Sequence, residues 1–182
     1  MIALLLGVLV FNAPAEVTPG AEEIVGKISV RGTRLAQSVT LSRQDGAPDI
    51  TDVLELKGDM VVELAQLQSA TVAVTGLAEG KTFVVKAYRI VDLGKGVVPW
   101  VGELTQQATG GLAIMDGQGE PIVLSLPPRS SRRLRQSVGA KLWVHGRKLL
   151  SGELKVLRYG ILRAAIGKPA ERLTPDTSGV ED

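Results

Sequence analysis

The chain has 182 residues, of which 45% are hydrophobic and only 3% aromatic, with no cysteine and one histidine. Without cysteine it can form neither a disulfide scaffold nor a thiolate-ligated zinc or iron–sulfur site. Its 21 Lys and Arg residues against 19 Asp and Glu give a formal net charge of +2, a balance that does not by itself indicate a polyanionic partner.

An apolar run of ten residues occupies positions 2–11. It is shorter than the roughly 20 residues that a membrane-spanning helix needs, and Ala13 and Ala15 form a small-residue pattern typical of signal-peptide cleavage. We therefore predict that residues 1–15 are a signal peptide cut after Ala15, that the protein is periplasmic or secreted, and that no transmembrane anchor remains. No Lys or Arg precedes the run, which departs from the pattern, and a buried N-terminal strand or helix is the alternative.

The rest of the chain contains an internal repeat. Residues 71–76 and 141–146 are both alternating strands that end in glycine, and they lie 70 positions apart. Tyr88 and Tyr159 lie 71 positions apart, which indicates that one residue has entered the last hairpin of the second copy. Three further segments match in the same order, namely 25–28 with 101–104, 54–56 with 124–126, and 64–66 with 134–136. The expected division is one domain at 24–92, a second at 98–163, and a flexible tail at 164–182.

Each copy is predicted to contain three strands, a short helix and two more strands. Asp45-Gly46 and Asp116-Gly117 are hairpin signals at equivalent places between the second and third strands. We expect Asp59 to cap the first helix and Ser130 to cap the second, which would end at Gly139. The strands of the second copy are expected at residues 101–107, 111–115, 121–126, 141–146 and 153–162.

This order of elements, together with the sequence GAKLWVHG…GELKVLRYGIL at 139–162, resembles a tandem of OB-fold domains in an exported bacterial protein. The resemblance implies an all-β fold with short helices, built as two tandem OB-like five-stranded Greek-key barrels. It carries over the fold alone, because many barrels share this pattern without a common function. A single β-sandwich of about ten strands is the alternative. The link at 91–99 is short, so we expect the two barrels to pack together.

The aromatic residues do not favour nucleic-acid binding. OB barrels that hold single strands stack bases on aromatic side chains of the second and third strands. Here the aromatic residues beyond the N-terminal run fall on first, fourth or fifth strands: Phe83, Tyr88, Trp100, Trp143 and Tyr159. The two equivalent tyrosines are expected to close the barrels from within.

The strongest local charge feature lies on the second predicted helix, at Arg129, Ser130, Arg132, Arg133 and Arg135. One interpretation is an anion-binding site, in which free backbone N–H groups, the serine and the arginines hold a phosphate, a sulfated glycan or an anionic headgroup. The other is the solvated face of a soluble helix, because these four arginines cannot all share one side.

No catalytic, metal or cofactor site is expected. His145 alternates with Leu142 and Val144, which places it on the strand face opposite the core, and we expect it to be exposed there. No nucleophile elbow accompanies it. Residues 116–120 resemble part of a calcium loop but lack its further acidic ligands.

These observations predict an exported, non-enzymatic OB-fold module for binding or assembly in the cell envelope. The alternative is a binder of small anionic ligands or anionic glycans through the arginine cluster. The expected partners are accordingly an envelope protein or a small anionic ligand, and not a nucleic acid.

Overall fold

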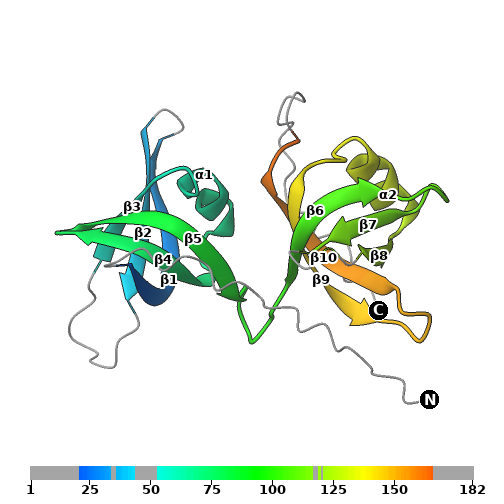
Figure 1. The fold of residues 1–182 in the computed structure, drawn as a ribbon, viewed down its shortest axis with the longest axis horizontal. Coiled ribbons are helices and arrows are strands. Elements are labelled where there is room, and N and C mark those ends of the chain that lie inside the picture. Colours follow the sequence, from blue (N-terminus) through cyan, green and yellow to red (C-terminus); the bar gives the residue numbers. More distant parts are fainter. Residues whose placement is uncertain (1–20, 34–35, 44–52, 117–118, 120, 166–182) are drawn as a thin grey trace, which may run out of the picture.

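The computed structural model describes residues 21–33, 36–43, 53–116, 119 and 121–165. The predicted signal peptide, the Asp45-Gly46 turn and most of the predicted tail lie outside these residues, as does Gly117. Two closed five-stranded barrels follow one another along the chain (Figure 1). The predicted all-β class with two tandem barrels is confirmed, and the alternative of a single β-sandwich is wrong because each sheet closes on itself.

Barrel 1 and barrel 2 each contain five strands and a helical segment between the third and fourth strands. Barrel 1 consists of β1 (Glu22–Thr33), β2 (Ala36–Arg43), β3 (Val53–Lys57), α1 (Val61–Leu64), the 3₁₀ turn η1 (Ala65–Leu67), β4 (Thr71–Glu79) and β5 (Thr82–Asp92). Barrel 2 consists of β6 (Trp100–Gln106), β7 (Leu112–Met115), β8 (Pro121–Ser125), α2 (Pro128–Arg135), β9 (Lys141–Lys148) and β10 (Leu154–Arg163).

The two barrels have the same topology. Strand neighbours run β1-β2-β3-β5-β4 in barrel 1, and the corresponding order in barrel 2 is β6-β7-β8-β10-β9. In each barrel the third and fifth strands are parallel, whereas the other pairs are antiparallel. This order is consistent with an OB-like fold and confirms the repeat inferred from the sequence.

The repeat extends to single backbone positions. A Cβ placed on Gly76 would lie 2.0 Å from the Val84 carbonyl oxygen, and one placed on Gly146 would lie 2.2 Å from the Lys155 oxygen. Both glycines lie at the register shift between the last two strands of their barrel. Only a residue without a side chain permits this close approach of backbones, which explains the matched glycines. The expectation that both strands end there is wrong, because β4 continues to Glu79 and β9 to Lys148.

The turns after the helical segments also correspond. Ser69 and Gly139 both have positive φ, 70° and 88°. Their N–H groups donate to the carbonyls of Ile28 and Leu104, at 2.9 and 2.8 Å. The same left-handed turn therefore ties the helical end of each barrel to its first strand, and it uses a glycine in only one of them.

The helices begin differently from the prediction. The residue before α1 is Met60 and the residue before α2 is Pro127, and neither helix has a side-chain capping bond. Asp59 is thus not the cap, and Ser130 lies inside the first turn of α2. Pro128 at the start of α2 explains the earlier beginning, because its fixed φ suits a first helical position.

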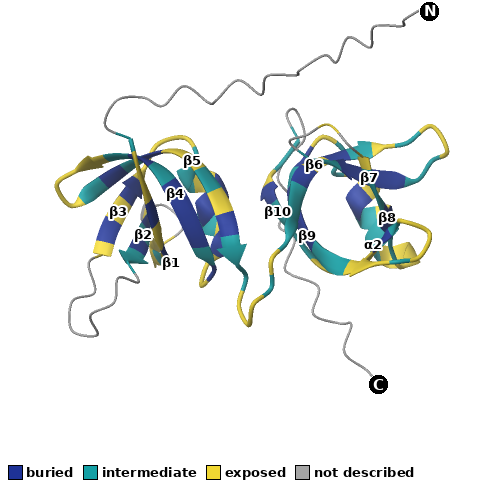
Figure 2. Ribbon diagram, turned by 60° about the horizontal axis from the view of Figure 1, so that its bottom comes forward, coloured by how far each residue is buried: buried dark blue, intermediate teal, exposed yellow. Residues whose placement is uncertain are grey.

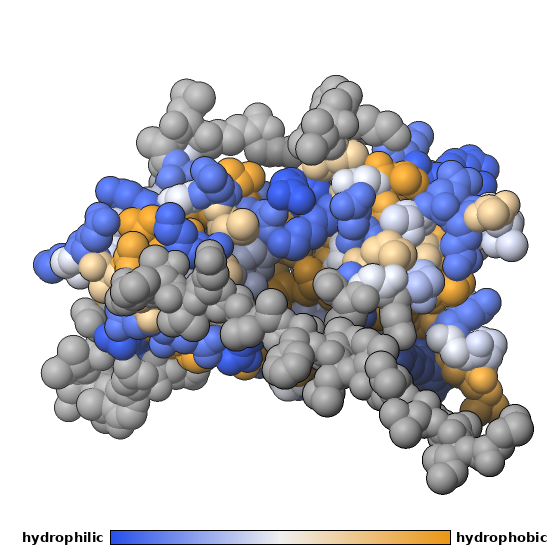
Figure 3. Space-filling view, viewed as in Figure 1, coloured by the Kyte–Doolittle hydropathy of each residue, from blue (hydrophilic) through white to orange (hydrophobic). Residues whose placement is uncertain are grey.

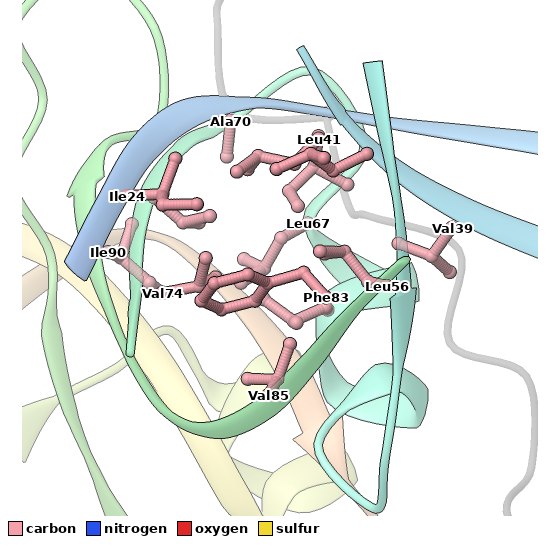
Figure 4. Close-up of a cluster of buried hydrophobic side chains, with 14 of the residues drawn as sticks. Ile24, Val39, Leu41, Leu56, Leu67, Ala70, Val74, Phe83, Val85 and Ile90 are labelled. Carbon is pink, nitrogen blue, oxygen red and sulfur yellow. The ribbon is translucent and has the colours of Figure 1, made fainter. Parts of the chain in front are cut away.

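Each barrel has its own core. Leu64 of α1 and Leu134 of α2 are equivalent and fully buried, so each helix covers its barrel interior with one leucine. In barrel 1 Phe83 lies among aliphatic side chains such as Leu56 and Val85 (Figure 4). Barrel 2 has a leucine, Leu154, at the place of Phe83, and its core is mainly aliphatic.

Candidate functional site

The most distinctive contact in the molecule is the one between the two barrels. The outer face of β9 and β10 lies toward barrel 1 (Figure 2), and β10 contacts both α1 and η1. Trp143 of β9 and Leu162 of β10 are 9% and 2% exposed and belong to the same apolar cluster as the core of barrel 1. The expectation that the barrels pack together is therefore confirmed.

Trp143 depends on a glycine in the neighbouring strand. It pairs with Gly160 across β9 and β10, and a Cβ on Gly160 would lie 2.4 Å from the indole Nε1. The indole thus lies against the bare backbone of β10. The equivalent pair in barrel 1 is Ala73 with Arg89, so only barrel 2 presents an aromatic ring on this face.

A buried carboxylate lies at the same contact. The side chain of Glu63, on α1, is 3% exposed. Its Oε2 accepts hydrogen bonds from the Tyr88 hydroxyl and from Lys141 Nζ, each at 2.6 Å. Its Oε1 lies 3.5 Å from a guanidinium nitrogen of Arg163. We call these four residues the Glu63 cluster; barrel 1 supplies the glutamate and tyrosine, and barrel 2 supplies both cations.

The electrostatics of the cluster keep Glu63 ionised. Burial alone would raise the pKa of the Glu63 carboxyl, but hydrogen bonds from Lys141 and Tyr88 and the charges of Lys141 and Arg163 outweigh it and lower the pKa. Burial and the hydrogen bond to Glu63 raise the pKa of Tyr88 well above its ordinary value. Lys141 Nζ also lies 4.9 Å from the centre of the Tyr88 ring. At neutral pH the cluster is thus a carboxylate held by a neutral hydroxyl and two cations.

The predicted anion-site residues are gathered on α2. Arg129, Arg132 and Arg135 are exposed, whereas Arg133 and Ser130 are partly buried. Arg135 donates to the Gly110 carbonyl at 3.1 Å. The other three arginines form no ion pair with any residue that the structure describes. The cluster is present as a basic surface, and whether it binds an anion stays a prediction.

His145 shares the outer face of β9 with Lys141 and Trp143. Leu142 and Val144 alternate with it and point into barrel 2, as predicted. The expected exposure is wrong, since His145 is partly buried, and its Nδ1 has no hydrogen-bond partner in the described part of the chain. Of the residues on this face, Trp143 and Lys141 contact barrel 1.

Within the described ranges, no group of three or more His, Cys, Asp or Glu side chains is placed to hold a metal ion. No helix in that part of the chain has the length and apolar character needed to cross a membrane.

Sequence reasoning missed the roles of Glu63 and Trp143 in the contact between the barrels. The available signal was the position of Glu63 immediately before the buried Leu64, where the second copy has Arg133 before Leu134. A charge reversal at one place of a repeat indicates that the two copies have different surroundings.

The comparisons with known proteins add no family. No family model matches the chain, and no curated protein matches it either.

Proposed function

We propose that this protein is an exported, non-enzymatic module for binding or assembly in the cell envelope, in which two OB-like barrels act as one recognition unit. The observation that supports this most strongly is the contact between the barrels. Trp143 and Leu162 extend the apolar cluster of barrel 1, and Glu63 binds cations of barrel 2. Export rests on the N-terminal sequence at 1–15.

A fixed contact between the barrels favours binding to a partner that spans both. Binding costs free energy when it immobilises domains that moved independently in the unbound protein. Because the two barrels already contact each other, a partner that spans both would not have to supply this cost. Both sheets are closed, so their strand edges are engaged in pairing. Recognition then falls on loops and outer faces rather than on free edges.

The test is capture of envelope proteins by the full chain after crosslinking. Trp143→Ala removes the indole that barrel 2 contributes to the apolar cluster of barrel 1, and we expect the weaker contact between the barrels to reduce capture of a partner that spans both. Val62→Ser is the matched control, since Val62 lies on α1 and is 67% exposed. Equal capture by all three proteins would contradict the two-barrel recognition unit.

Export is tested separately. The full-length chain is produced in a bacterial host, the cells are fractionated, and the mature protein is analysed by mass spectrometry. We expect the protein outside the cytoplasm with Glu16 as its first residue. An intact N-terminus in the cytoplasmic fraction would contradict it.

A second candidate function is the binding of small anionic ligands or anionic glycans by α2. It is favoured by the absence of ion-pair partners for Arg129, Arg132 and Arg133 among the described residues. We expect calorimetric binding of inorganic pyrophosphate or dextran sulfate that weakens steeply with salt and is lost in the double variant Arg132→Gln, Arg133→Gln. Binding that is indifferent to salt would exclude this function.

A further inference from the structure

The last hairpins of the two barrels are equivalent but differ in length. In barrel 1, Glu79 pairs with Thr82 and leaves a two-residue turn, Gly80 and Lys81. In barrel 2 the Leu149 N–H donates to the Glu153 carbonyl at 2.8 Å, which leaves three residues, 150–152, at the tip. The one additional residue of the second copy, which the repeat spacing placed in this hairpin, therefore lies in the turn itself.

The extra residue gives barrel 2 an apolar tip. The Gly152 N–H donates to the Leu149 carbonyl at 3.0 Å, closing a turn in which Leu150 and Ser151 form the apex. Gly152 has a φ of 85°, which completes the three-residue loop. The side chain of Leu150 is fully exposed to solvent.

Charged side chains surround the base of this hairpin. Arg147 pairs with Lys155, and Lys148 pairs with Leu154. Both strands thus carry exposed cations next to the tip: Arg147, Lys148 and Lys155. The equivalent hairpin of barrel 1 has the reverse arrangement, with apolar residues at the base, Leu77, Ala78 and Val84, and charged residues at the tip, Glu79 and Lys81. The two hairpins therefore share a backbone plan and have inverted polarity.

We propose that the β9–β10 hairpin of barrel 2 docks onto a lipid bilayer that contains anionic headgroups. Leu150 enters the boundary between headgroups and acyl chains, while Arg147, Lys148 and Lys155 contact the headgroups. An apolar side chain ahead of basic ones is the arrangement that suits this interface, since each cation near an anionic membrane and each buried methylene adds to binding. This inference goes beyond the proposed function and does not depend on it.

The shape of the hairpin favours a lipid surface over a protein pocket. Its most exposed apolar side chain, Leu150, lies at the apex, whereas Leu157 of β10 is less exposed and lies farther along the strand. The cations lie on both strands behind the apex, and the acidic residue between them, Glu153, is partly buried. In Figure 3 the outer end of this hairpin, at the lower right, carries hydrophobic residues beside hydrophilic ones. β9 begins soon after α2 and ends at this hairpin, so the arginines of α2 lie at the other end of the strand.

The first experiment is cosedimentation of the full chain with vesicles of phosphatidylcholine, alone or mixed with phosphatidylglycerol. We expect binding to the mixed vesicles and much weaker binding to the neutral ones. Leu150→Ser should weaken binding about tenfold, because it removes the inserted side chain. Arg147→Gln and Lys148→Gln should each weaken binding about fivefold, by loss of one charge contact.

Two control variants distinguish docking of this hairpin from nonspecific binding of the protein to vesicles. Val62→Ser removes an exposed valine from barrel 1, and the pair Lys57→Gln, Lys86→Gln removes two exposed cations from barrel 1; both should bind mixed vesicles nearly as the unaltered chain does. Circular dichroism should be unchanged for all variants because every altered side chain is at least partly exposed. If the Lys57→Gln, Lys86→Gln variant no longer binds the vesicles and Leu150→Ser still does, the proposal is wrong.

The absence of cysteine provides a second measurement. Leu150→Cys can be labelled at a single site with a polarity-sensitive fluorophore, and Ala78→Cys labels the equivalent hairpin of barrel 1. We expect a blue shift with mixed vesicles for the label at position 150 and none for the label at 78. The proposal would be overturned if the chain did not bind the vesicles, or if the labels at positions 150 and 78 both shifted. It would also be overturned if the hairpin bound a protein partner and the chain had no affinity for lipid.

Discussion

The two barrels have the same strand order, but they differ at equivalent places on their outer surfaces. Glu63 of α1 corresponds to Arg133 of α2. Lys141 and Arg163, which face each other in barrel 2, correspond to Thr71 and Asp92 in barrel 1. The core leucines and the glycines at the register shifts are shared, whereas the charges at these surface positions differ. Interior packing fixes the fold, and the outer face decides what each barrel contacts.

The helical ends of the two barrels also differ in polarity. The helical end of barrel 1 presents Met60 and Val61, which pack against the apolar cluster shared with barrel 2. The corresponding residues of barrel 2 are Ser130 and Ser131, beside exposed arginines. The helical end of barrel 1 is therefore apolar where it contacts barrel 2, and the equivalent end of barrel 2 is polar.

Trp143→Ala gives barrel 2 the residue that barrel 1 has at this place, and it should have the largest effect. Loss of a mostly buried indole at the contact should lower the free energy of unfolding by about 4 kcal/mol. Guanidinium denaturation measures this, with Trp100 as the remaining fluorescent tryptophan. A loss below about 1 kcal/mol would mean that the contact between the barrels is weak.

Gly76→Ala and Gly146→Ala test whether the two glycines at the register shifts of β4 and β9 are equivalent. Each added methyl group would overlap a backbone carbonyl of the next strand, so each variant should lose about 3 kcal/mol of unfolding free energy. Thermal denaturation monitored by circular dichroism would compare them. Gly80→Ala is the control for glycine replacement near a strand end, since a Cβ there meets no atom within 4 Å, although its φ of 64° adds a smaller strain.

Glu63→Gln keeps the shape of the side chain and removes the charge at the contact. Lys141 and Arg163 then lose their carboxylate, and we expect a loss of about 2 kcal/mol in chemical denaturation at neutral pH. Glu23→Gln is the matched control, because its ion pair with Arg89 is exposed and should be worth less than about 1 kcal/mol. Equal losses in both variants would show that burial of Glu63 adds nothing.

The same carboxylate predicts how stability depends on pH. The pKa of Glu63 is lower in the folded protein than its ordinary value of 4.5. Its stabilisation is therefore complete above about 4.5 and is lost as the pH falls through the lower folded pKa. Denaturation midpoints measured from neutral to acidic pH should fall more steeply for the unaltered chain than for Glu63→Gln, and parallel curves would contradict the assignment.

Ser69→Gly makes the left-handed turn of barrel 1 identical to that of barrel 2 and should have the smallest effect. Because Ser69 has a φ of 70°, glycine should raise the free energy of unfolding by about 1 kcal/mol. The reciprocal change, Gly139→Ser, should lower it by a similar amount. The two melting temperatures should move in opposite directions, and a shift in the same direction would show that the turns are not equivalent.

The sequence by itself determined the fold of each barrel, because the signals for that fold are local. Alternating strands, matched glycines and the repeat spacing were sufficient to predict two tandem five-stranded barrels. Local signals were less reliable at the helix starts, where Asp59 and Ser130 were expected to cap and a proline instead sets the start of α2.

Only the tertiary structure decided how the barrels meet. Glu63 and Lys141 are 78 residues apart and carry no local pattern that pairs them. Trp143 and His145 were correctly placed on an outer face, but what covers that face depends on the other barrel. The inverted polarity of the two hairpins likewise became clear only when strand pairing aligned them residue by residue. Strand formation follows from neighbours in sequence, whereas contacts between barrels depend on residues that only folding brings together.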